Sequence, residues 1–297
     1  MNEIKKSGII TICGRPNVGK STLTNALVGE KVAIVTNKPQ TTRNRICGIV
    51  TRADTQFVFV DTPGYHKART KLGDYMVNVS KDSIANVDAT ILVVEPIASI
   101  GPQEEGLIAQ IKGTNCPAIL AINKIDTVEK ESLLEVIALY SQTAAFDAII
   151  PICAKSGDGV EQLLKACEQY AIESPFLFDE ELTTDQPERQ VMAEIIREKI
   201  LWNLDREIPH GTAVEITRFS ERDNGIIDID ATIYCEKASH KGIIIGKGGA
   251  MLKKISSQAR TDCERFMGTK VYLTTWVKVK ENWRDSDFLV RNFGYSE

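Results

Sequence analysis

The sequence of 297 residues has no apolar run long enough to cross a lipid bilayer, which takes about 20 apolar residues in a helix. We therefore expect no transmembrane segment. The short apolar run at 9–13 ends at Gly14-Arg15, so it predicts a strand and not a signal peptide. C-x-x-C pairs are also missing, and the seven cysteines are scattered and odd in number. This argues against a disulfide framework or a zinc site and indicates reduced thiols in a cytosol.

A large net charge is missing too, since the formal charge is −4 at pH 7, which argues against a protein coated in positive charge. The charge is uneven, however. The stretch 237–280 carries ten Lys and Arg against two acids, which is about +8, and the rest of the chain is about −12. A local basic patch on an acidic protein predicts a specific site for a polyanion.

A glycine-rich segment lies between a predicted buried strand at 8–13 and the first turns of a predicted helix. It reads Gly14-Arg15-Pro16-Asn17-Val18-Gly19-Lys20-Ser21 and matches the phosphate-binding P-loop pattern at every fixed position. Glycines let the backbone wrap a phosphate, and the helix N-terminus points unpaired N–H groups at the anion. We expect Lys20 to reach the β- and γ-phosphates and the Ser21 hydroxyl to bind Mg²⁺.

A second phosphate element, Asp61-Thr62-Pro63-Gly64, follows the predicted strand at 57–60. Asp61 can hold the metal through water, and Gly64 leaves its N–H free for the γ-phosphate. Between the two elements lies Pro39-Gln40-Thr41-Thr42-Arg43. A threonine there would bind Mg²⁺ only when the γ-phosphate is present and make the loop a switch; the residues alone leave Thr41 and Thr42 open.

The base-recognition element is Asn123-Lys124-Ile125-Asp126, directly after the predicted strand at 118–122. The Asp126 carboxylate can accept bonds from both guanine N1–H and the 2-amino group, which adenine lacks. Cys153-Ala154-Lys155 ends the next strand, where the Ala154 N–H could cap the base. In this order, each at the carboxyl end of a strand, the elements resemble a translation-factor-class GTPase domain.

The water-orienting glutamine that many regulatory GTPases carry directly after D-x-x-G is absent. Tyr65 stands at that position, with His66 next. A lone histidine in a loop is more often solvated than catalytic, so we expect slow intrinsic hydrolysis.

The hydrophobic pattern predicts two different domains. Strand-like runs at 8–13, 56–60, 89–94, 118–122 and 148–152 alternate with helices, which predicts an α/β P-loop domain with a mostly parallel sheet and helices on both faces. The stretches 43–52 and 56–60 are expected to form an antiparallel hairpin at its edge. Residues 188–297 follow an α-β-β-α-α-β order, a smaller α+β domain. We therefore expect a GTPase domain at 1–173, a linker at 174–187 and a second domain with a C-terminal tail at 188–297.

The second domain contains Ile244-Ile245-Gly246-Lys247-Gly248-Gly249-Ala250-Met251-Leu252-Lys253-Lys254-Ile255. This resembles the I-G-x-x-G core of a KH domain, whose loop clamps about four nucleotides through its backbone. An ordinary glycine-rich turn is the alternative, but the flanking apolar residues, the positive charge and the element order favour the KH interpretation. The expected RNA-binding residues are Ile245, Gly246, Lys247, Gly248, Gly249, Lys253 and Lys254. Trp276 and Trp283 are expected in the core or in a domain contact.

Nearly the whole chain resembles the Era family of GTPases, with a P-loop domain followed by a type II KH domain. Beside the motifs above, the resemblance rests on Gln40-Thr41-Thr42-Arg43, Glu194-Ile195-Ile196-Arg197-Glu198-Lys199 and Trp276-Val277-Lys278-Val279-Lys280 with Trp283. One departure is Cys153, where the family usually has Ser.

The resemblance implies a bacterial-type assembly factor for the small ribosomal subunit that binds GTP or GDP with Mg²⁺. Its KH domain would bind the 3′ end of 16S rRNA, and its GTP state would gate that binding. Thr42 is then the metal-sensing threonine, with Lys20, Thr42, Gly64 and Asn17 as catalytic residues. The resemblance also implies a cytoplasmic monomer and allows peripheral contact with the membrane.

A K⁺ ion is a further cofactor that the resemblance allows. Asn17 lies in the P-loop, and relatives with this Asn include members stimulated by K⁺. Its side-chain carbonyl could hold a cation that neutralises developing charge, as an arginine finger does. The alternative is that Asn17 only shapes the turn.

Two functions remain open. Hydrolysis of GTP could time rRNA maturation, or the protein could be a nucleotide-gated RNA-binding scaffold in which hydrolysis only resets the RNA-binding state. A tRNA-modifying GTPase is disfavoured, because the chain has no C-terminal catalytic Cys motif.

Overall fold

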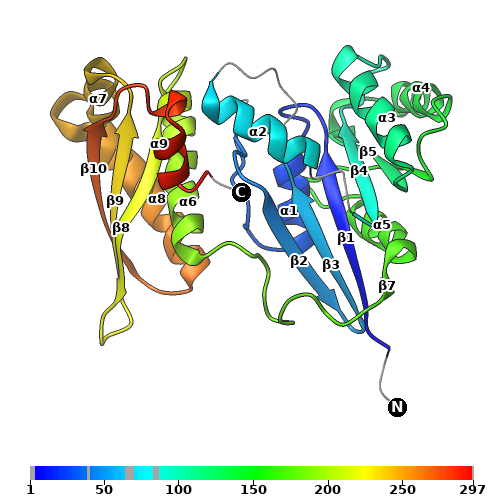
Figure 1. The fold of residues 1–297 in the computed structure, drawn as a ribbon, viewed down its shortest axis with the longest axis horizontal. Helices are drawn as coiled ribbons and strands as arrows, with labels where there is room; N and C mark the ends of the chain where they lie inside the picture. The colour runs from blue at the N-terminus through cyan, green and yellow to red at the C-terminus, as the bar shows by residue number, and fades with distance from the viewer. Residues whose placement is uncertain (1–3, 39–40, 64–69, 83–86, 296–297) are drawn as a thin grey trace. The chain divides into compact units, whose positions relative to one another are not determined.

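The computed structural model describes residues 4–38, 41–63, 70–82 and 87–295 (Figure 1), and the chain divides into two compact units. The first unit comprises Met1–Ala33, Thr42–Lys67 and Met76–Asp185. The second comprises Gln186–Glu297 together with Ile34–Thr41 and Ala68–Tyr75. Two segments of the N-terminal half are therefore assigned to the C-terminal unit. In the described part of the chain no helix is long and apolar enough to cross a membrane.

A twisted sheet with the order β2-β3-β1-β4-β5-β6 forms the centre of the first unit. Its pairs are parallel except at the β2–β3 hairpin, where β2 is the antiparallel edge strand. Short β7 pairs antiparallel with the start of β1. The predicted parallel sheet and edge hairpin are confirmed. The strands are β1 (Lys6–Cys13), β2 (Ile46–Arg52), β3 (Thr55–Asp61), β4 (Ala89–Val94), β5 (Ala118–Ile122), β6 (Ala148–Pro151) and β7 (Ile172–Glu173).

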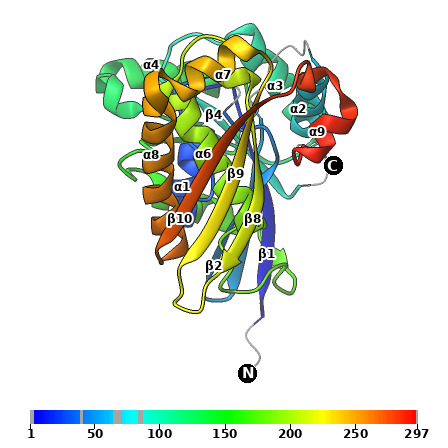
Figure 2. The same cartoon turned by 90° about the vertical axis from the view of Figure 1, so that its left-hand side faces the viewer.

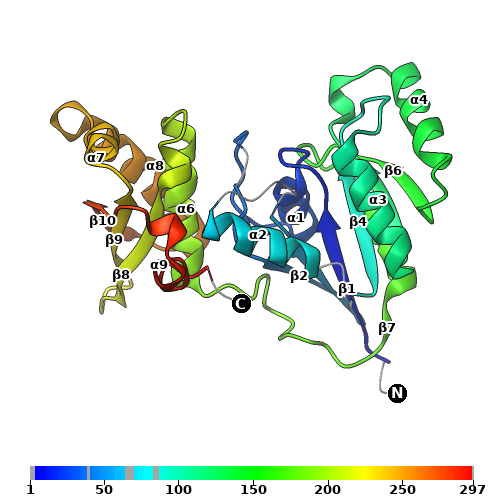
Figure 3. The same cartoon turned by 45° about the horizontal axis from the view of Figure 1, so that its top comes forward.

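Helices cover both faces of this sheet (Figures 1 and 3). On one face α1 (Lys20–Val28) and α5 (Val160–Cys167) pack on the apolar side chains of β1, β3, β4 and β5. On the other face α3 (Pro102–Thr114) and α4 (Lys130–Ser141) pack on β4 and β5. The strands are buried on both faces, as parallel strands flanked by helices must be. The chain also forms α2 (Lys71–Asp82), whose residues are divided between the two units.

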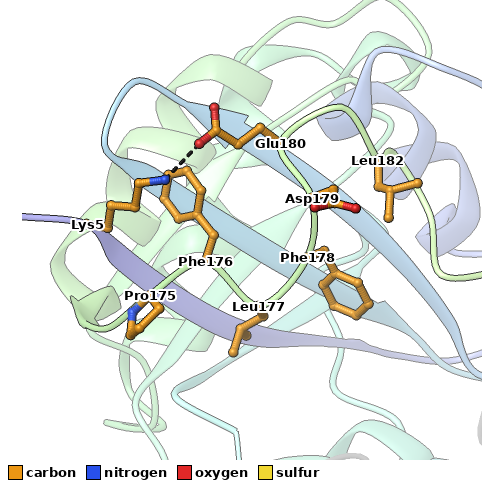
Figure 4. Close-up of a pocket in the computed structure, with 8 residues that line it drawn as sticks. All are labelled: Lys5, Pro175, Phe176, Leu177, Phe178, Asp179, Glu180 and Leu182. Carbon is orange, nitrogen blue, oxygen red and sulfur yellow. Dashed lines mark hydrogen bonds and ion pairs between the residues drawn. The ribbon is translucent and has the colours of Figure 1, made fainter.

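The segment after β7 follows the sheet instead of leaving it. The buried Gln56 side chain of β3 accepts from the N–H groups of Leu177 and Phe178 and donates to the Phe178 carbonyl. Further along, Ile49 donates its N–H to the Thr183 carbonyl at 2.9 Å. Figure 4 shows the surface pocket of about 580 Å³ that this segment forms with Lys5. No residue of the nucleotide motifs lines that pocket.

The second unit has a three-stranded sheet in the order β10-β9-β8, with β9 antiparallel to β8 and parallel to β10 (Figure 2). The predicted order of elements is confirmed. It is α6 (Glu188–Asn203), β8 (Ala213–Glu221), β9 (Ile227–Cys235), α7 (Ala238–Ile245), α8 (Ala250–Met267) and β10 (Val271–Val279), followed by α9 (Asp287–Asn292).

One face of this sheet packs against the helices. Alternate residues of β9, from Ile227 to Cys235, form one apolar cluster with side chains of α6, α7 and α8. Trp283 is fully buried, and its indole N–H donates to the Gly211 carbonyl at 2.9 Å. For Trp276, expected in the core or in a domain contact, the core alternative is wrong, since the residue is 59% exposed. It is out of phase with Val277, which faces the helices, and neighbouring residues of a strand point to opposite faces.

Candidate functional site

The P-loop connects β1 to α1, and at two of its glycine positions no other residue fits. Gly14 has a φ of +148°, and a Cβ there would lie 2.4 Å from the Val93 carbonyl oxygen. Gly19 has a φ of +101°, and a Cβ there would lie 2.2 Å from Nδ2 of Asn123. Any side chain at either position would clash, so the tight turn requires glycine.

Lys20 lies inside this loop. Its ammonium donates to the carbonyls of Gly14 at 3.1 Å and Arg15 at 3.0 Å. Burial lowers its pKa, and the nearby Asp61 carboxylate partly opposes that effect. A buried cation encircled by backbone groups suits a phosphate, because the anion would replace solvent that burial has removed.

Three oxygen-bearing side chains converge beside Lys20. The Ser21 hydroxyl donates to Oδ2 of Asp61 at 2.7 Å and lies 2.8 Å from the Thr42 hydroxyl. Asp61 is fully buried, and its Oδ1 atom has no hydrogen-bond partner among the described residues. Burial raises the Asp61 pKa to about 6, against the opposing effect of Lys20. Two hydroxyls and a carboxylate with an unused oxygen are a donor set that Mg²⁺ accepts, directly or through water.

The geometry distinguishes the two candidate threonines. Thr41 directs its hydroxyl to the Thr36 hydroxyl, at 2.7 Å, and the Lys38 carbonyl, at 2.6 Å. Thr42, by contrast, is buried beside Ser21 and Asp61. This supports Thr42 as the metal-sensing residue. The predicted γ-phosphate contact Gly64, with Tyr65 and His66, lies outside the described residues, whereas Thr62 and Pro63 are buried and the Thr62 hydroxyl donates to the Ile12 carbonyl.

The predicted base-recognition loop is tied to the P-loop by Asn123. Its amide donates to the Val18 carbonyl at 2.8 Å, and its Oδ1 accepts the Ala154 N–H at 2.9 Å. The N–H predicted to cap the base is therefore already bonded in this structure. Asp126 is exposed, as a base-binding carboxylate must be before the nucleotide arrives, and the Cys153 thiol donates to its Oδ1 at 3.3 Å. A thiol thus supports Asp126.

Two carboxylates outside the sequence motifs, Glu95 and Glu104, contact the P-loop, and Glu95 also contacts the base-recognition loop. Glu95, directly after β4, accepts from Lys124 at 2.5 Å and lies 3.7 Å from the Arg15 guanidinium. Glu104 of α3 is 3.0 Å from Arg15. Lys124 also donates to the Asn17 carbonyl at 2.8 Å. The position of Glu95 at a strand's carboxyl end was a usable signal, because the nucleotide motifs occupy the same positions on neighbouring strands.

The glycine-rich loop of the second unit joins α7 to α8, as predicted. Gly246 has a φ of +73°, and a Cβ there would lie 2.7 Å from the Met251 Cβ, so only glycine fits. Gly248 and Gly249 also have positive φ but face open space. Lys247, Lys253 and Lys254 are exposed, whereas Ile245 is partly buried against the core. An open backbone surrounded by exposed lysines at the start of an 18-residue helix suits a phosphate chain.

The second unit also holds the segment that precedes Thr42. The Arg197 guanidinium donates to the Thr41 carbonyl, and Glu198 accepts the Val35 N–H at 2.9 Å. The Trp202 indole donates to the Val35 carbonyl, also at 2.9 Å. All three side chains come from α6, which packs on α8 through a 2.5 Å ion pair between Lys199 and Asp262. Helix α8 directly follows the glycine-rich loop, so packed contacts connect that loop to the residue next to Thr42.

Comparison with known families and proteins agrees with this geometry. A family model described as a 50S ribosome-binding GTPase matches residues 9–124, and a KH-domain model matches residues 207–284. GTPase Era of Ruminiclostridium cellulolyticum is 52% identical over 290 residues, covering 98% of this chain and 97% of that protein. GTPase Era of Alkaliphilus oremlandii is 53% identical over 291 residues, covering 98% and 99%.

Two solved structures resemble the chain over its full length, each with a TM-score of 0.93 and 36% sequence identity. One is the crystal structure of Era in complex with MgGDPNP and nucleotides 1506–1542 of 16S ribosomal RNA. The superposed region covers 99% of this chain and 100% of that chain. The other is an Aquifex aeolicus Era variant bound to GDP·AlF4⁻, which covers 98% and 100%.

Proposed function

Because this chain belongs to the Era family of GTPases, we propose that it binds the 3′ end of 16S rRNA through its KH domain and acts in assembly of the small ribosomal subunit. It is an enzyme that hydrolyses GTP to GDP and phosphate and uses Mg²⁺. One observation carries the proposal. The same chain contains side chains arranged to bind a guanine nucleotide and a G-x-x-G loop that is open to solvent.

We propose the following roles for the chain's own residues. Lys20 binds the β- and γ-phosphates, Asp126 binds guanine, and Ser21, Thr42 and Asp61 hold the metal. Mg²⁺, when bound, neutralises the charge that develops on the phosphates. The loop backbone of Gly14–Ser21, with Gly64, provides N–H groups, and Asn123, Lys124 and Ala154 support the base. The domain division into 1–173, 174–187 and 188–297 is proposed with these roles, as are action as a monomer in the cytoplasm and peripheral contact with the membrane.

Gating of RNA binding by the nucleotide follows from the contacts of α6. Ordering of Thr42 on the metal would pull on Thr41, whose carbonyl accepts from Arg197. A shift of α6 would then reach α8 through Lys199 and Asp262. If these contacts differ between the GTP and GDP states, as we propose, the nucleotide biases the affinity for RNA.

The test is GTP turnover and RNA affinity measured together, with an RNA of nucleotides 1506–1542 as the probe. We expect tighter RNA binding with a non-hydrolysable GTP analogue than with GDP, and faster turnover when RNA is bound. Unchanged turnover would favour the alternative, a gated scaffold in which hydrolysis only resets the protein. Equal RNA affinity in both nucleotide states would contradict gating.

Trp202→Phe sharpens this experiment, because it keeps an aromatic ring over Lys199 and removes only the N–H that binds the Val35 carbonyl. A hydrogen bond contributes about 1 kcal/mol, so we expect the GTP-to-GDP ratio of RNA affinities to fall roughly fivefold. Tyr170→Phe, which removes a 2.8 Å hydrogen bond to Asp147 in the first unit, is the control and should leave the ratio unchanged.

We also propose that K⁺ accelerates hydrolysis through Asn17. In support, Asn17 is exposed within the P-loop. Its φ of +66° is a conformation that Asn and Gly adopt and is shared with the alternative, in which Asn17 only shapes the turn. Single-turnover hydrolysis should be about tenfold faster in K⁺ than in Na⁺ at equal ionic strength. Asn17→Gly should abolish this difference without straining the backbone, whereas Asn17→Ala adds a left-handed penalty of about 1 kcal/mol. Equal rates in both salts, or a K⁺ effect that survives in Asn17→Gly, would contradict the proposal.

A further inference from the structure

Strand β10 forms one edge of the second sheet, and its two faces differ sharply. Its odd-numbered apolar side chains pack against the helices, namely Val271, Leu273, Val277 and Val279. The even-numbered positions therefore point to the other side of the sheet. We call this set the outer face of β10; including the residues that flank the strand, it consists of Lys270, Tyr272, Thr274, Trp276, Lys278 and Lys280.

The two aromatic rings of this outer face are unusually open. Tyr272 is 60% and Trp276 is 59% exposed. They stand four residues apart on an extended strand, which separates them by about 13 Å. A single exposed aromatic residue is ordinary, but two on the same strand face, with three exposed lysines in the same phase, form a pattern. Figure 2 shows β10 and β9 running side by side in this sheet.

The surroundings of Tyr272 and Trp276 combine arginines with two acids of β9, Asp228 opposite Tyr272 and Asp230 opposite Thr274. The Arg222 guanidinium lies 5.3 Å from the Tyr272 ring centroid, a cation–π contact. The adjacent Asp228 is already paired, at 2.5 Å with Arg222 and 3.3 Å with Arg218. Its charge is therefore compensated by these two arginines. Lys278 and Lys280 keep their charge available for a ligand, whereas Lys270 lies 3.7 Å from Glu264 of α8.

Another part of the same sheet side is already covered by the chain itself. The Tyr234 ring of β9 lies 4.8 Å from the Phe293 ring, and Trp283 packs on Phe293 at 5.3 Å. The C-terminal segment thus covers the aromatic side chain of β9 but leaves Tyr272 and Trp276 exposed.

The alternation of rings and lysines indicates the chemistry of the ligand. Aromatic side chains on a sheet stack on unpaired bases, and neighbouring lysines pair with phosphates. A protein partner fits less well, because the centres of protein interfaces are depleted in lysine. Charge complementarity therefore favours an RNA single strand.

We propose that the outer face of β10 is a second surface for single-stranded RNA, in which Tyr272 and Trp276 stack on bases. It rests on the proposed function, since it adds to the RNA contacts of the G-x-x-G loop. The two surfaces are separate, because the loop joins α7 and α8 on the helix side of the sheet. An RNA longer than the stretch held by the loop would contact both.

The test uses the full-length protein and single-stranded fragments of nucleotides 1506–1542 of 16S rRNA, from about four nucleotides, the length that a G-x-x-G loop clamps, up to about twenty. Wild-type affinity should rise beyond the length that the loop holds. Trp276→Ala and Tyr272→Ala should each weaken binding of the longest fragments about tenfold and leave the shortest fragments unchanged. Trp276→Phe, which keeps a stacking ring, should retain most of the affinity. Phe288→Ala is the matched control, since Phe288 is 71% exposed on α9 of the same unit.

The outcomes separate this proposal from the function on which it rests. The affinity falls as the salt concentration rises, and Lys278→Gln should make this fall less steep. The magnitude of the slope of log affinity against log salt should decrease by about 0.7, the value for one phosphate contact on a single strand. Equal binding of long fragments by wild type and Trp276→Ala would overturn the second surface but leave the loop site intact. Loss of short and long fragments alike would also overturn it. Failure of the wild type to bind any fragment would contradict the proposed function itself.

Discussion

Changing Asp126 to Asn should convert the protein from a guanine- to a xanthine-nucleotide-binding enzyme. The carboxylate is exposed at the carboxyl end of β5, where it can accept from guanine N1–H and the 2-amino group together. Asn replaces one acceptor by a donor: its Oδ1 still accepts from N1–H, whereas its NH2 group opposes the 2-amino group of guanine and matches the carbonyl that xanthine has at that position. Two hydrogen bonds to a charged group contribute roughly 4 kcal/mol, so we expect about a thousandfold loss of GTP relative to xanthosine triphosphate.

Competition between the two triphosphates in equilibrium binding measures this exchange. The control is Asp179→Asn, the same substitution at another exposed aspartate, in the segment after β7. It should leave the preference for GTP unaltered. If Asp126→Asn still prefers GTP, guanine is recognised elsewhere. Cys153→Ser offers a milder comparison. It keeps a donor beside Asp126, where the thiol is 3.3 Å away, and should retain the wild-type preference.

The double change Lys247→Asp and Gly248→Asp should abolish RNA binding while GTP binding persists. Both residues are exposed, and the space around Gly248 is open. Gly248 has a φ of +59°, a conformation that Asp tolerates better than most residues. The fold should therefore survive, but a loop that must approach phosphates would carry two negative charges. We expect RNA affinity to fall at least about a hundredfold at moderate salt.

Gly29→Asp with Lys165→Asp is the matched control. Gly29 has the same kind of open, positive-φ position, with a φ of +84°, and Lys165 is an exposed lysine of α5; both lie in the first unit. This pair changes the net charge equally, so a general electrostatic effect would weaken RNA binding in both proteins. Wild-type RNA affinity in the Lys247 and Gly248 variant would mean that the loop is only a turn between two helices.

The sequence by itself determined the parts of this protein whose geometry is local. A P-loop or a G-x-x-G turn is a contiguous segment, and its glycines are required by clashes and φ values within the segment and its nearest contacts, as at Gly14 and Gly246. The same holds for the order of strands and helices, which follows from hydrophobic periodicity. Family membership followed from these contiguous motifs and is confirmed by full-length relatives at about 50% identity.

The tertiary structure decided which distant side chains meet. Asn123 joins Val18 to Ala154, and Glu95 joins Arg15 to Lys124, across separations of tens of residues that no local pattern encodes. The assignment of residues 34–41 to the unit that contains α6 was equally hidden.

Trp276 shows the reason most clearly. Its large apolar ring predicted a buried side chain. Burial in a strand, however, depends on which face the helices cover, and the helices cover the face of Val277. A periodicity of two separates the faces of a strand but does not say which face is the inner one.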